Sequence, residues 1–236
     1  MRIFVANTGR CGSKFMTSVF NALTNIPSFH ENRPYCIGQT AKEINNDCVS
    51  GESQKIINDK MAKIKCYPEY FEANNMFIKS FVWPLLDEID DMYVIYLHRN
   101  PLDTFLSLGE RCWQTGLDWV LQPHWKKNFL RTTEPMKFLE VINWNWYEVR
   151  ERFYRLRKHF KKTYDFDFRQ INNLGEYYKM FDYFGISYKR VDAMPAFDRN
   201  ENTAGKPVTK RYLEIIENDL NKKWDKPGIE WIFEDK

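Results

Sequence analysis

RIFVANTGRCGSKF (residues 2–15) decides the fold of this chain. The apolar residues at its start predict a buried strand, and two glycines follow within a short turn. Apolar residues at helical spacing after the turn predict a helix over residues 15–23. The start of a helix favours an anion, because the N–H groups of its first turn have no partner within the helix. Since Arg10 and Lys14 add positive charge there, the sequence predicts a site for a phosphate-like or sulfate-like group.

The turn differs from the phosphate-binding loop of P-loop kinases and ATPases. That loop has the form Gly-x-x-x-x-Gly-Lys-Ser/Thr, and its last residue holds magnesium. Here Gly9 and Gly12 are too close together, and Phe15 follows Lys14 where the hydroxyl would stand. Many α/β proteins have a glycine turn at this place for packing reasons alone, which is the alternative to an anion site.

A second strand–turn–helix pattern begins at Tyr93. The run YVIYL predicts a buried strand, and Asn100 and Pro101 suit the cap and the first position of the helix that follows. Arg99 then stands at the carboxyl end of a strand, and Ser107 lies about two turns into the helix. Ligands of open α/β sheets bind at the carboxyl ends of the strands, so we expect Arg99 and the glycine turn at one edge of the sheet.

Together these two segments resemble the sulfotransferases that use 3'-phosphoadenosine 5'-phosphosulfate (PAPS). Residues 10–13, Arg-Cys-Gly-Ser, resemble the first loop of that family, which has a basic residue, a small residue, Gly and then Ser or Thr. The second motif of the family has Arg, then Pro two positions later and Ser eight positions after the Arg. Arg99, Pro101 and Ser107 have that spacing. Lys14 departs from the family, which usually has Thr or Ser there, and its role stays open.

The resemblance implies a fold and a reaction. The fold is α/β with three layers, P-loop NTPase-like, with a central, mainly parallel sheet and helices on both faces, in a single domain of residues 1–236. The reaction is in-line transfer of the sulfuryl group of PAPS to a hydroxyl or amine. The acceptor would be a carbohydrate, a lipid or a small molecule, with a peptide tyrosine as a further option. No metal is expected, since a sulfuryl group carries less charge than a phosphoryl group.

The resemblance also assigns residues to the PAPS site. They are Arg10, Cys11, Gly12, Ser13, Lys14, Phe15, Arg99, Ser107, Gly205 and Lys206. The amides of the first helical turn would hold the 5'-phosphosulfate, and Arg10 would neutralise the charge that builds on the bridging oxygen. Arg99 and Ser107 would hold the 3'-phosphate, with Lys206 in a late loop covering it. Phe15 would stack on the adenine.

Transfer to a hydroxyl needs a base that takes its proton as the new S–O bond forms. In several carbohydrate sulfotransferases a glutamate shortly after the first helix looks like that base, and Glu31 matches it by position. His30 is the rival by chemistry, and His124 is a third candidate. The alternative is that Glu31 and His30 form a solvated surface pair. We favour Glu31 as the catalytic base.

Composition limits the class of protein. A net charge of only +3 makes nucleic acid an unlikely partner, and no apolar run approaches the roughly 20 residues of a membrane span. Five cysteines without framework spacing argue for a reducing compartment, and no CxxC or histidine-rich cluster suggests a metal. Because the sequence starts directly with a strand, without a signal peptide, we expect a cytoplasmic protein.

Further elements are expected around this site. Residues 36–51 predict a loop or a lid, and residues 53–65 predict an amphipathic helix. Residues 76–82 predict a strand in which Lys79 faces either the site or solvent. Residues 84–91 predict a short acidic helix that leads into the strand at Tyr93.

The second half of the chain has its own expected features. A tryptophan-rich stretch over 112–135 predicts a wall for the acceptor, with filling of the core as the alternative. A helix over 136–162 is followed by a strand over 164–168, and a last helix is expected over 209–224. The long helix carries a predicted basic outer face, formed by Arg150, Arg152, Arg155, Arg157, Lys158, Lys161 and Lys162.

Two other functions stay open from the sequence. A magnesium-dependent P-loop kinase of a small molecule would need a magnesium-binding Asp after a buried strand, but the strand at Tyr93 ends in His98 and Arg99. A non-catalytic adaptor would keep the fold and bind an acidic partner through the basic helix over 150–162.

Overall fold

The computed structural model describes residues 1–118, 120–130 and 135–195, without the side chains of Leu102, Trp113 and Gln114. The chain divides into two compact units, Met1–Arg199 and Asn200–Lys236, and we describe the first by itself. The expected single domain over 1–236 therefore stays a prediction. The helix expected over 209–224 lies outside the described residues.

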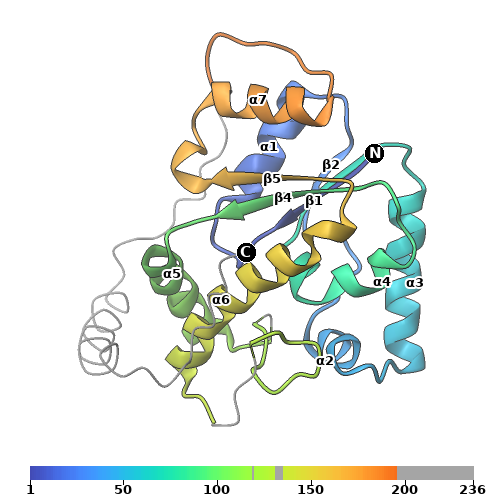
Figure 1. Cartoon of the computed structure of the whole chain (residues 1–236), viewed down its shortest axis with the longest axis vertical. Coiled ribbons are helices and arrows are strands. Elements are labelled where there is room, and N and C mark those ends of the chain that lie inside the picture. The colour runs from blue at the N-terminus through green and yellow to red at the C-terminus, as the bar shows by residue number, and fades with distance from the viewer. Residues whose placement is uncertain (119, 131–134, 196–236) are drawn as a thin grey trace. The chain divides into compact units, whose positions relative to one another are not determined.

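A five-stranded parallel sheet forms the centre of this unit (Figure 1). Its strands are β1 (Arg2–Ala6), β2 (Ser28–His30), β3 (Tyr70–Ala73), β4 (Met92–His98) and β5 (Lys162–Asp167). Their order is β2-β3-β1-β4-β5, so the strand before the glycine turn is the central one. Arg2 pairs with Tyr70 of β3 on one side and with Met92 of β4 on the other. The predicted α/β fold is confirmed, and the strand pairings described are all parallel.

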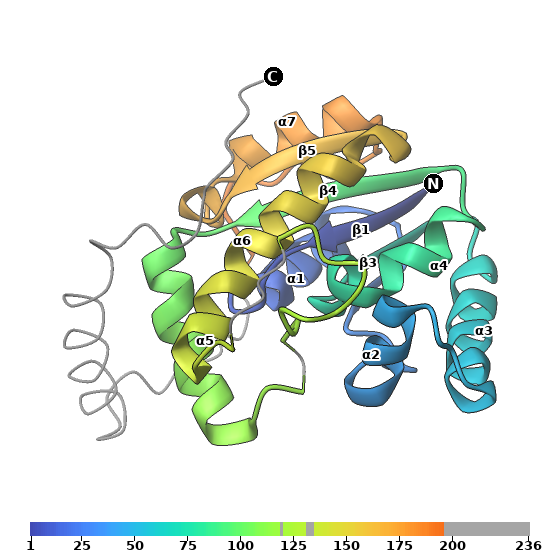
Figure 2. The same ribbon diagram turned by 60° about the horizontal axis from the view of Figure 1, so that its bottom comes forward.

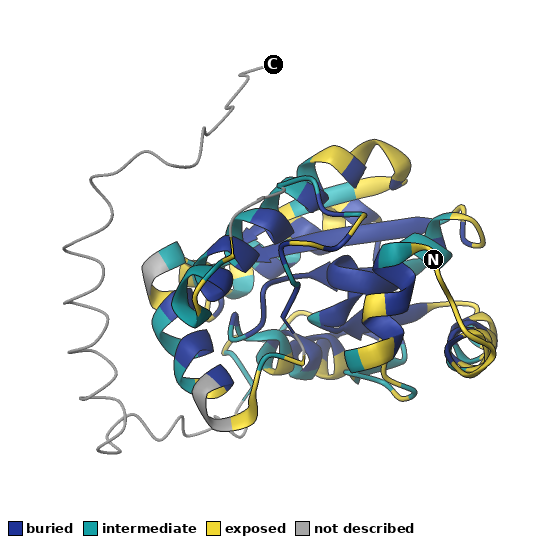
Figure 3. Cartoon of the chain, turned by 90° about the horizontal axis from the view of Figure 1, so that it is seen from below, coloured by how far each residue is buried: buried dark blue, intermediate teal, exposed yellow. Residues whose placement is uncertain are grey.

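Helices cover both faces of the sheet (Figure 2). On one face lie α1 (Ser13–Leu23) and α7 (Leu174–Phe184). On the other lie α2 (Gly38–Asn46), α3 (Gly51–Lys65), α4 (Val82–Leu86) and α6 (Phe138–Leu156), and α5 (Pro101–Thr115) packs against α6. The alternation of β1 divides the core, because Ile3 and Val5 face α1 while Phe4 and Ala6 face the opposite layer. Figure 3 shows buried strands between helices with exposed outer sides.

The connections place a topological switch point at β1. The chain leaves β1 toward α1 on one face, whereas β3 and β4, the two neighbours of β1, continue into helices of the opposite layer. Loops that diverge to opposite faces leave room between them at the carboxyl ends of the strands, which is where such sheets bind ligands. The glycine turn stands at this point.

Two segments differ from the prediction. The strand expected over 76–82 is wrong, because Phe77–Phe81 form one π-helical turn, η1, that runs into α4. The third strand along the chain is instead β3. The sequence did not indicate it, because the charged Glu72 interrupts its short apolar run. A short apolar run does not distinguish a buried strand from a buried helix, and η1 is buried throughout. The loop expected over 36–51 is also wrong, since it contains α2.

The ends of two expected helices move as well. The acidic helix expected over 84–91 is the single turn of α4, which ends at Leu86. The helix expected over 136–162 ends at Leu156, and a short 3-10 turn over Arg157–His159 leads into β5. The remaining predicted helices and strands, at β1, α1, α3, β4, α5 and β5, are confirmed.

Candidate active site

The glycine turn has a left-handed backbone at three of its residues. The φ angles are 91° at Gly9, 58° at Arg10 and 81° at Gly12. At Gly12 a Cβ atom would lie 2.9 Å from Cε2 of Phe168, so the position has neither the backbone nor the space for a side chain. Gly12 is the N-cap of α1 and has no side chain that could cap it. The first N–H groups of α1 thus start at a cap that offers no side-chain acceptor.

The two sequence motifs meet at Arg10. Its Nε donates a hydrogen bond to Oγ of Ser107 on α5, at 3.1 Å. Nη1 of Arg99, at the end of β4, donates to the carbonyl oxygen of Arg10, also at 3.1 Å. The adjacency of β1 and β4 in the sheet brings these residues together, as the sequence predicts. The Asn100 side chain accepts a bond from Asp103 N at 3.4 Å, which fits its expected role as the cap of α5.

Positive charge gathers at this point. Burial lowers the pKa of Arg10, and Arg111 and Arg99 act in the same direction while Glu110 opposes them. The guanidinium still stays protonated at neutral pH, because arginine does not lose its proton in proteins. Nε of Arg99 is buried and has no hydrogen-bond acceptor among the described residues; its nearest acidic oxygen belongs to Asp103, 4.0 Å away. Such an arrangement suits an anion.

Phe168 is a site residue that the sequence did not indicate. Its ring lies under the guanidinium of Arg99, with 4.7 Å from Cζ to the ring centroid, and it also fills the space beside Gly12. Phe168 follows β5, so it reaches the site from the far side of β4. One ring therefore supports both the turn and the arginine of the second motif.

His30 and Glu31 lie where β2 ends. The His30 ring nitrogen Nε2 lies 3.1 Å from Oγ of Ser13, the first residue of α1. Desolvation lowers the pKa of His30, with Lys14 adding to the effect and Glu31 opposing it. Glu31 is left-handed (φ 50°), and its Oε1 accepts a hydrogen bond of 2.7 Å from Nδ2 of Asn75. The structure thus brings both candidate bases to the edge of the sheet that carries the glycine turn.

Lys79 connects this corner to the turn. Its Nζ donates to the carbonyl oxygen of Thr8 at 2.9 Å and lies 3.4 Å from Oδ1 of Asn75. The side chain is fully buried, and burial lowers the pKa of Lys79 to about 8. The prediction left open whether Lys79 faces the site or solvent, and the structure places it against the turn. The signal in the sequence was a lysine inside an apolar run, MFIKSFV (residues 76–82). A lysine buried in such a run needs polar partners, and here they belong to the turn and to Asn75.

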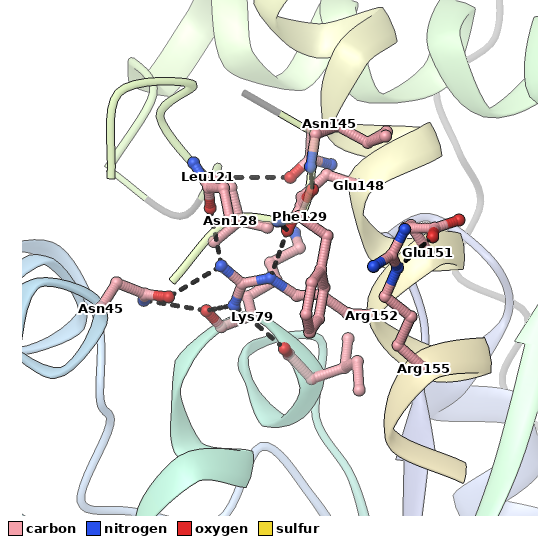
Figure 4. A network of polar contacts seen from close by, with 12 residues as sticks. Asn45, Lys79, Leu121, Asn128, Phe129, Asn145, Glu148, Glu151, Arg152 and Arg155 are labelled. Atoms are coloured by element: carbon pink, nitrogen blue, oxygen red, sulfur yellow. Dashed lines mark hydrogen bonds and ion pairs between the residues drawn. The ribbon is translucent and has the colours of Figure 1, made fainter. Parts of the chain in front are cut away.

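Arg152 holds the backbone of Lys79 through its guanidinium (Figure 4). Its Nη1 donates to the carbonyl oxygens of Lys79 and Ile78, at 2.6 and 3.4 Å. Its Nη2 donates to Asn45 and Asn128 at 2.8 and 2.7 Å, and its Nε pairs with Glu148 at 2.7 Å. The prediction that Arg152 belongs to the outer basic face is therefore wrong. It is completely buried, since its helix turns this side toward η1 and α2.

The other predicted site residues are placed as follows. Cys11 turns its thiol inward, 3.2 Å from Oγ1 of Thr8, so only its backbone can face a ligand. Lys14 is exposed, and Phe15 is half-buried against the core under α1, where adenine stacking stays a prediction. Gly205 and Lys206 lie outside the described residues.

The tryptophan-rich stretch contributes little to the site. Trp125 is buried in the core cluster that includes residues of α2, η1 and α6, which is the alternative to an acceptor wall. His124 is exposed on the loop beside it. The side chains of Trp113 and Trp119 are not among those described, so their part in an acceptor wall stays a prediction.

Neither the protein-family models nor the curated proteins that we searched contain a match to this chain. Among the described residues, no helix has the length and apolar character that crossing a bilayer requires.

Proposed function

We propose that the protein is a sulfotransferase that moves the sulfuryl group of PAPS to a hydroxyl or amine. The observation that carries this proposal is that Arg99 and Ser107 both bond to Arg10. In the transfer, the bond from sulfur to the bridging oxygen breaks and a bond from sulfur to the acceptor oxygen forms. The acceptor proton passes to a base, and 3',5'-adenosine bisphosphate leaves with the negative charge.

The residues present fit an anionic nucleotide with two phosphate groups. The buried Nε–H of Arg99 lacks an acceptor among the described residues, and a phosphate oxygen would supply one. Ser107 offers a hydroxyl beside it, on α5. The start of α1 offers backbone N–H groups and a helix dipole for a second anionic group, a short way along the turn.

Glu31 is our candidate for the base. It lies on the same edge of the sheet as the glycine turn, and an amide hydrogen bond from Asn75 holds its carboxylate. His30 instead contacts Ser13 of α1, and the lowered pKa of His30 keeps it neutral at physiological pH. A neutral imidazole can also take a proton, so Glu31→Gln and His30→Gln, compared for transfer rate, separate the two candidates.

Calorimetric titration with 3',5'-adenosine bisphosphate, beside AMP and ATP, with and without magnesium, tests the proposal. We expect metal-independent binding of the bisphosphate and little binding of AMP, since AMP lacks the 3'-phosphate. Binding of ATP only in the presence of magnesium would favour the kinase instead. Absence of nucleotide binding would overturn the proposal.

A second candidate function is binding of an acidic partner through the basic end of α6. A cavity of about 400 Å³ lies there, lined by Phe129, Arg155, Leu156, Lys158 and His159. Leu156, Lys158 and His159 come just before β5 in the chain. The cavity therefore lies at the edge of the sheet where the strands begin, opposite the glycine turn. Arg157, Lys161 and Lys162 extend the exposed positive charge.

Poly-L-glutamate is a suitable probe for this surface. A Lys158→Glu, Lys161→Glu variant should lose salt-sensitive binding of the polymer and keep its affinity for 3',5'-adenosine bisphosphate. Equal binding of the polymer by the variant and the unmodified protein would exclude this surface as the docking site.

A further inference from the structure

The Asn75 side chain bridges two charged groups at the candidate active site. Its Nδ2 donates to Oε1 of Glu31 at 2.7 Å, and its Oδ1 lies 3.4 Å from Nζ of Lys79. Nζ of Lys79 also donates to the carbonyl oxygen of Thr8 at 2.9 Å. A continuous path of polar contacts therefore runs from the glycine turn to the carboxylate of the candidate base.

We propose that Asn75 is a positioning residue for sulfuryl transfer, which fixes the carboxylate of Glu31 relative to the glycine turn by bridging it to Lys79. This inference rests on the proposed function. A side-chain amide suits the role, because it offers donors on one side and an acceptor on the other. A carboxylate only accepts and an ammonium only donates, so the two partners fix the orientation of the amide.

The lysine end of the bridge is anchored from several sides. The carbonyl oxygen of Lys79 accepts bonds from Arg152 and from Nδ2 of Asn45, the latter at 2.9 Å. Both of these side chains are buried, and the Lys79 side chain itself is enclosed by the core. Lys79 thus gives Asn75 a fixed point inside the core, while Asn75 and Glu31 themselves are half-buried.

The glutamate end needs such a holder. Glu31 follows the short edge strand β2 and has a left-handed backbone, which is uncommon for a residue other than glycine. Its backbone N–H donates to the carbonyl oxygen of Ala73 at 3.1 Å, which fixes the main chain. The bond from Asn75 then fixes the carboxylate, and misplacing a catalytic group by about 1 Å can cost on the order of 100-fold in rate.

Two substitutions at this position separate positioning from folding. Asn75→Leu removes both contacts at similar size, and Asn75→Asp keeps an acceptor for Lys79 but turns a carboxylate oxygen toward Glu31. Asn21→Asp is the matched control, because Asn21 joins α1 to β2 through a bond from Nδ2 to the carbonyl oxygen of Ser28, at 3.2 Å, on the exposed surface. It makes the same chemical change at a residue outside the path.

The variants are compared in three measurements: affinity for 3',5'-adenosine bisphosphate, kcat and KM for PAPS turnover, and the pH dependence of kcat. Turnover is measured with water as the acceptor and with a panel of sugar and phenol hydroxyls. We expect Asn75→Leu to lower kcat about 10- to 100-fold, with bisphosphate affinity changed by less than about threefold. Asn75→Asp should also move the acid limb of the kcat profile to higher pH, because two facing carboxylates share a proton more readily. A loss of folding alone does not move that limb.

The outcomes that overturn the inference are distinct from those that overturn the proposed function. Turnover by the unmodified protein, with unchanged kcat and an unchanged pH profile in both Asn75 variants, overturns the inference alone. Failure of the unmodified protein to bind the bisphosphate or to turn over PAPS overturns the proposed function, and with it this inference.

Discussion

Nε of Arg10 and Oγ of Ser107 lie 3.1 Å apart, although 97 positions separate the two residues in the chain. The contact joins the turn after β1 to the helix after β4, and it exists because these strands are neighbours in the sheet. Each motif alone is only suggestive. The contact makes one charged corner of two segments that the sequence places far apart, and it gives the first prediction.

Ser107→Ala is expected to weaken binding of 3',5'-adenosine bisphosphate about 10-fold or more and to leave binding of AMP unchanged. A hydrogen bond to a charged group is worth about 1.5–3 kcal/mol, and only the bisphosphate has the 3'-phosphate that would accept it. Calorimetric titration measures both affinities. Ser18→Ala on α1 is the control, since its hydroxyl donates to the carbonyl oxygen of Lys14 within the same helix. An equal loss of affinity for the two nucleotides would show that Ser107 does not bind the 3'-phosphate.

Gly12→Ala should destabilise the protein by about 1–3 kcal/mol, because alanine is strained at φ 81° and its Cβ would displace the Phe168 ring. Displacing that ring also removes the support of Arg99, so nucleotide affinity should fall with stability. Gly51→Ala, in the first turn of α3, meets nothing within 4 Å and should be neutral or slightly stabilising. Urea unfolding of both variants checks this. Equal stabilities would show that the turn tolerates a side chain.

Lys79 should make stability depend on pH in the alkaline range. Burial lowers its pKa from 10.5 to about 8, so between these values the unfolded chain holds a proton at this side chain that the folded protein has lost. The free energy of unfolding therefore rises with pH across this window, by up to about 3 kcal/mol in all. The test is the stability of the unmodified protein minus that of Lys79→Met, from urea unfolding at pH 7.5 and 10.5. A difference that does not grow with pH would contradict the buried placement.

Arg152→Met should cost about 3–5 kcal/mol of unfolding free energy, because it leaves the buried carboxylate of Glu148 without its cation. Arg155→Met removes the same charge from the same helix, one turn later, where the side chain is exposed and pairs with Glu151. An exposed pair contributes less than about 1 kcal/mol, so this control should be nearly neutral. Similar losses at both positions would mean that Arg152 is not the buried hub of Figure 4.

The parts of the fold that the sequence predicted are those with local causes. The strand–turn–helix units at β1–α1 and β4–α5 each combine a short apolar run, turn residues and helical periodicity within about 25 positions. The rule that ligands bind at the carboxyl ends of parallel strands then placed Arg10, Arg99 and Ser107 together. Glu31 was assigned from the resemblance by its position after the first helix, and the structure places it at the same edge, at the end of β2.

The parts that it missed depend on distant partners. β3 carries Glu72 at its centre, and that buried carboxylate is paired with Lys60 of α3 at 2.6 Å. It also accepts hydrogen bonds from Asn32, Tyr70 and Asn74. Arg152 is buried because Asn45 and Asn128, both far away in the chain, accept its hydrogen bonds. The sequence-based prediction used only the charge of Arg152, and it therefore placed this residue on the surface. Phe168 follows β5 and reaches the glycine turn past β4, which no local pattern indicates.

The two hydrogen bonds that involve Arg10 respond differently to a substitution at position 10. Arg99 bonds the main chain of residue 10, which any amino acid possesses, whereas Ser107 bonds the side chain. A replacement at position 10 therefore leaves the contact with Arg99 available but removes the one with Ser107. In descendants of this sequence, substitutions at 10 and 107 should occur together, while position 99 stays constant through both.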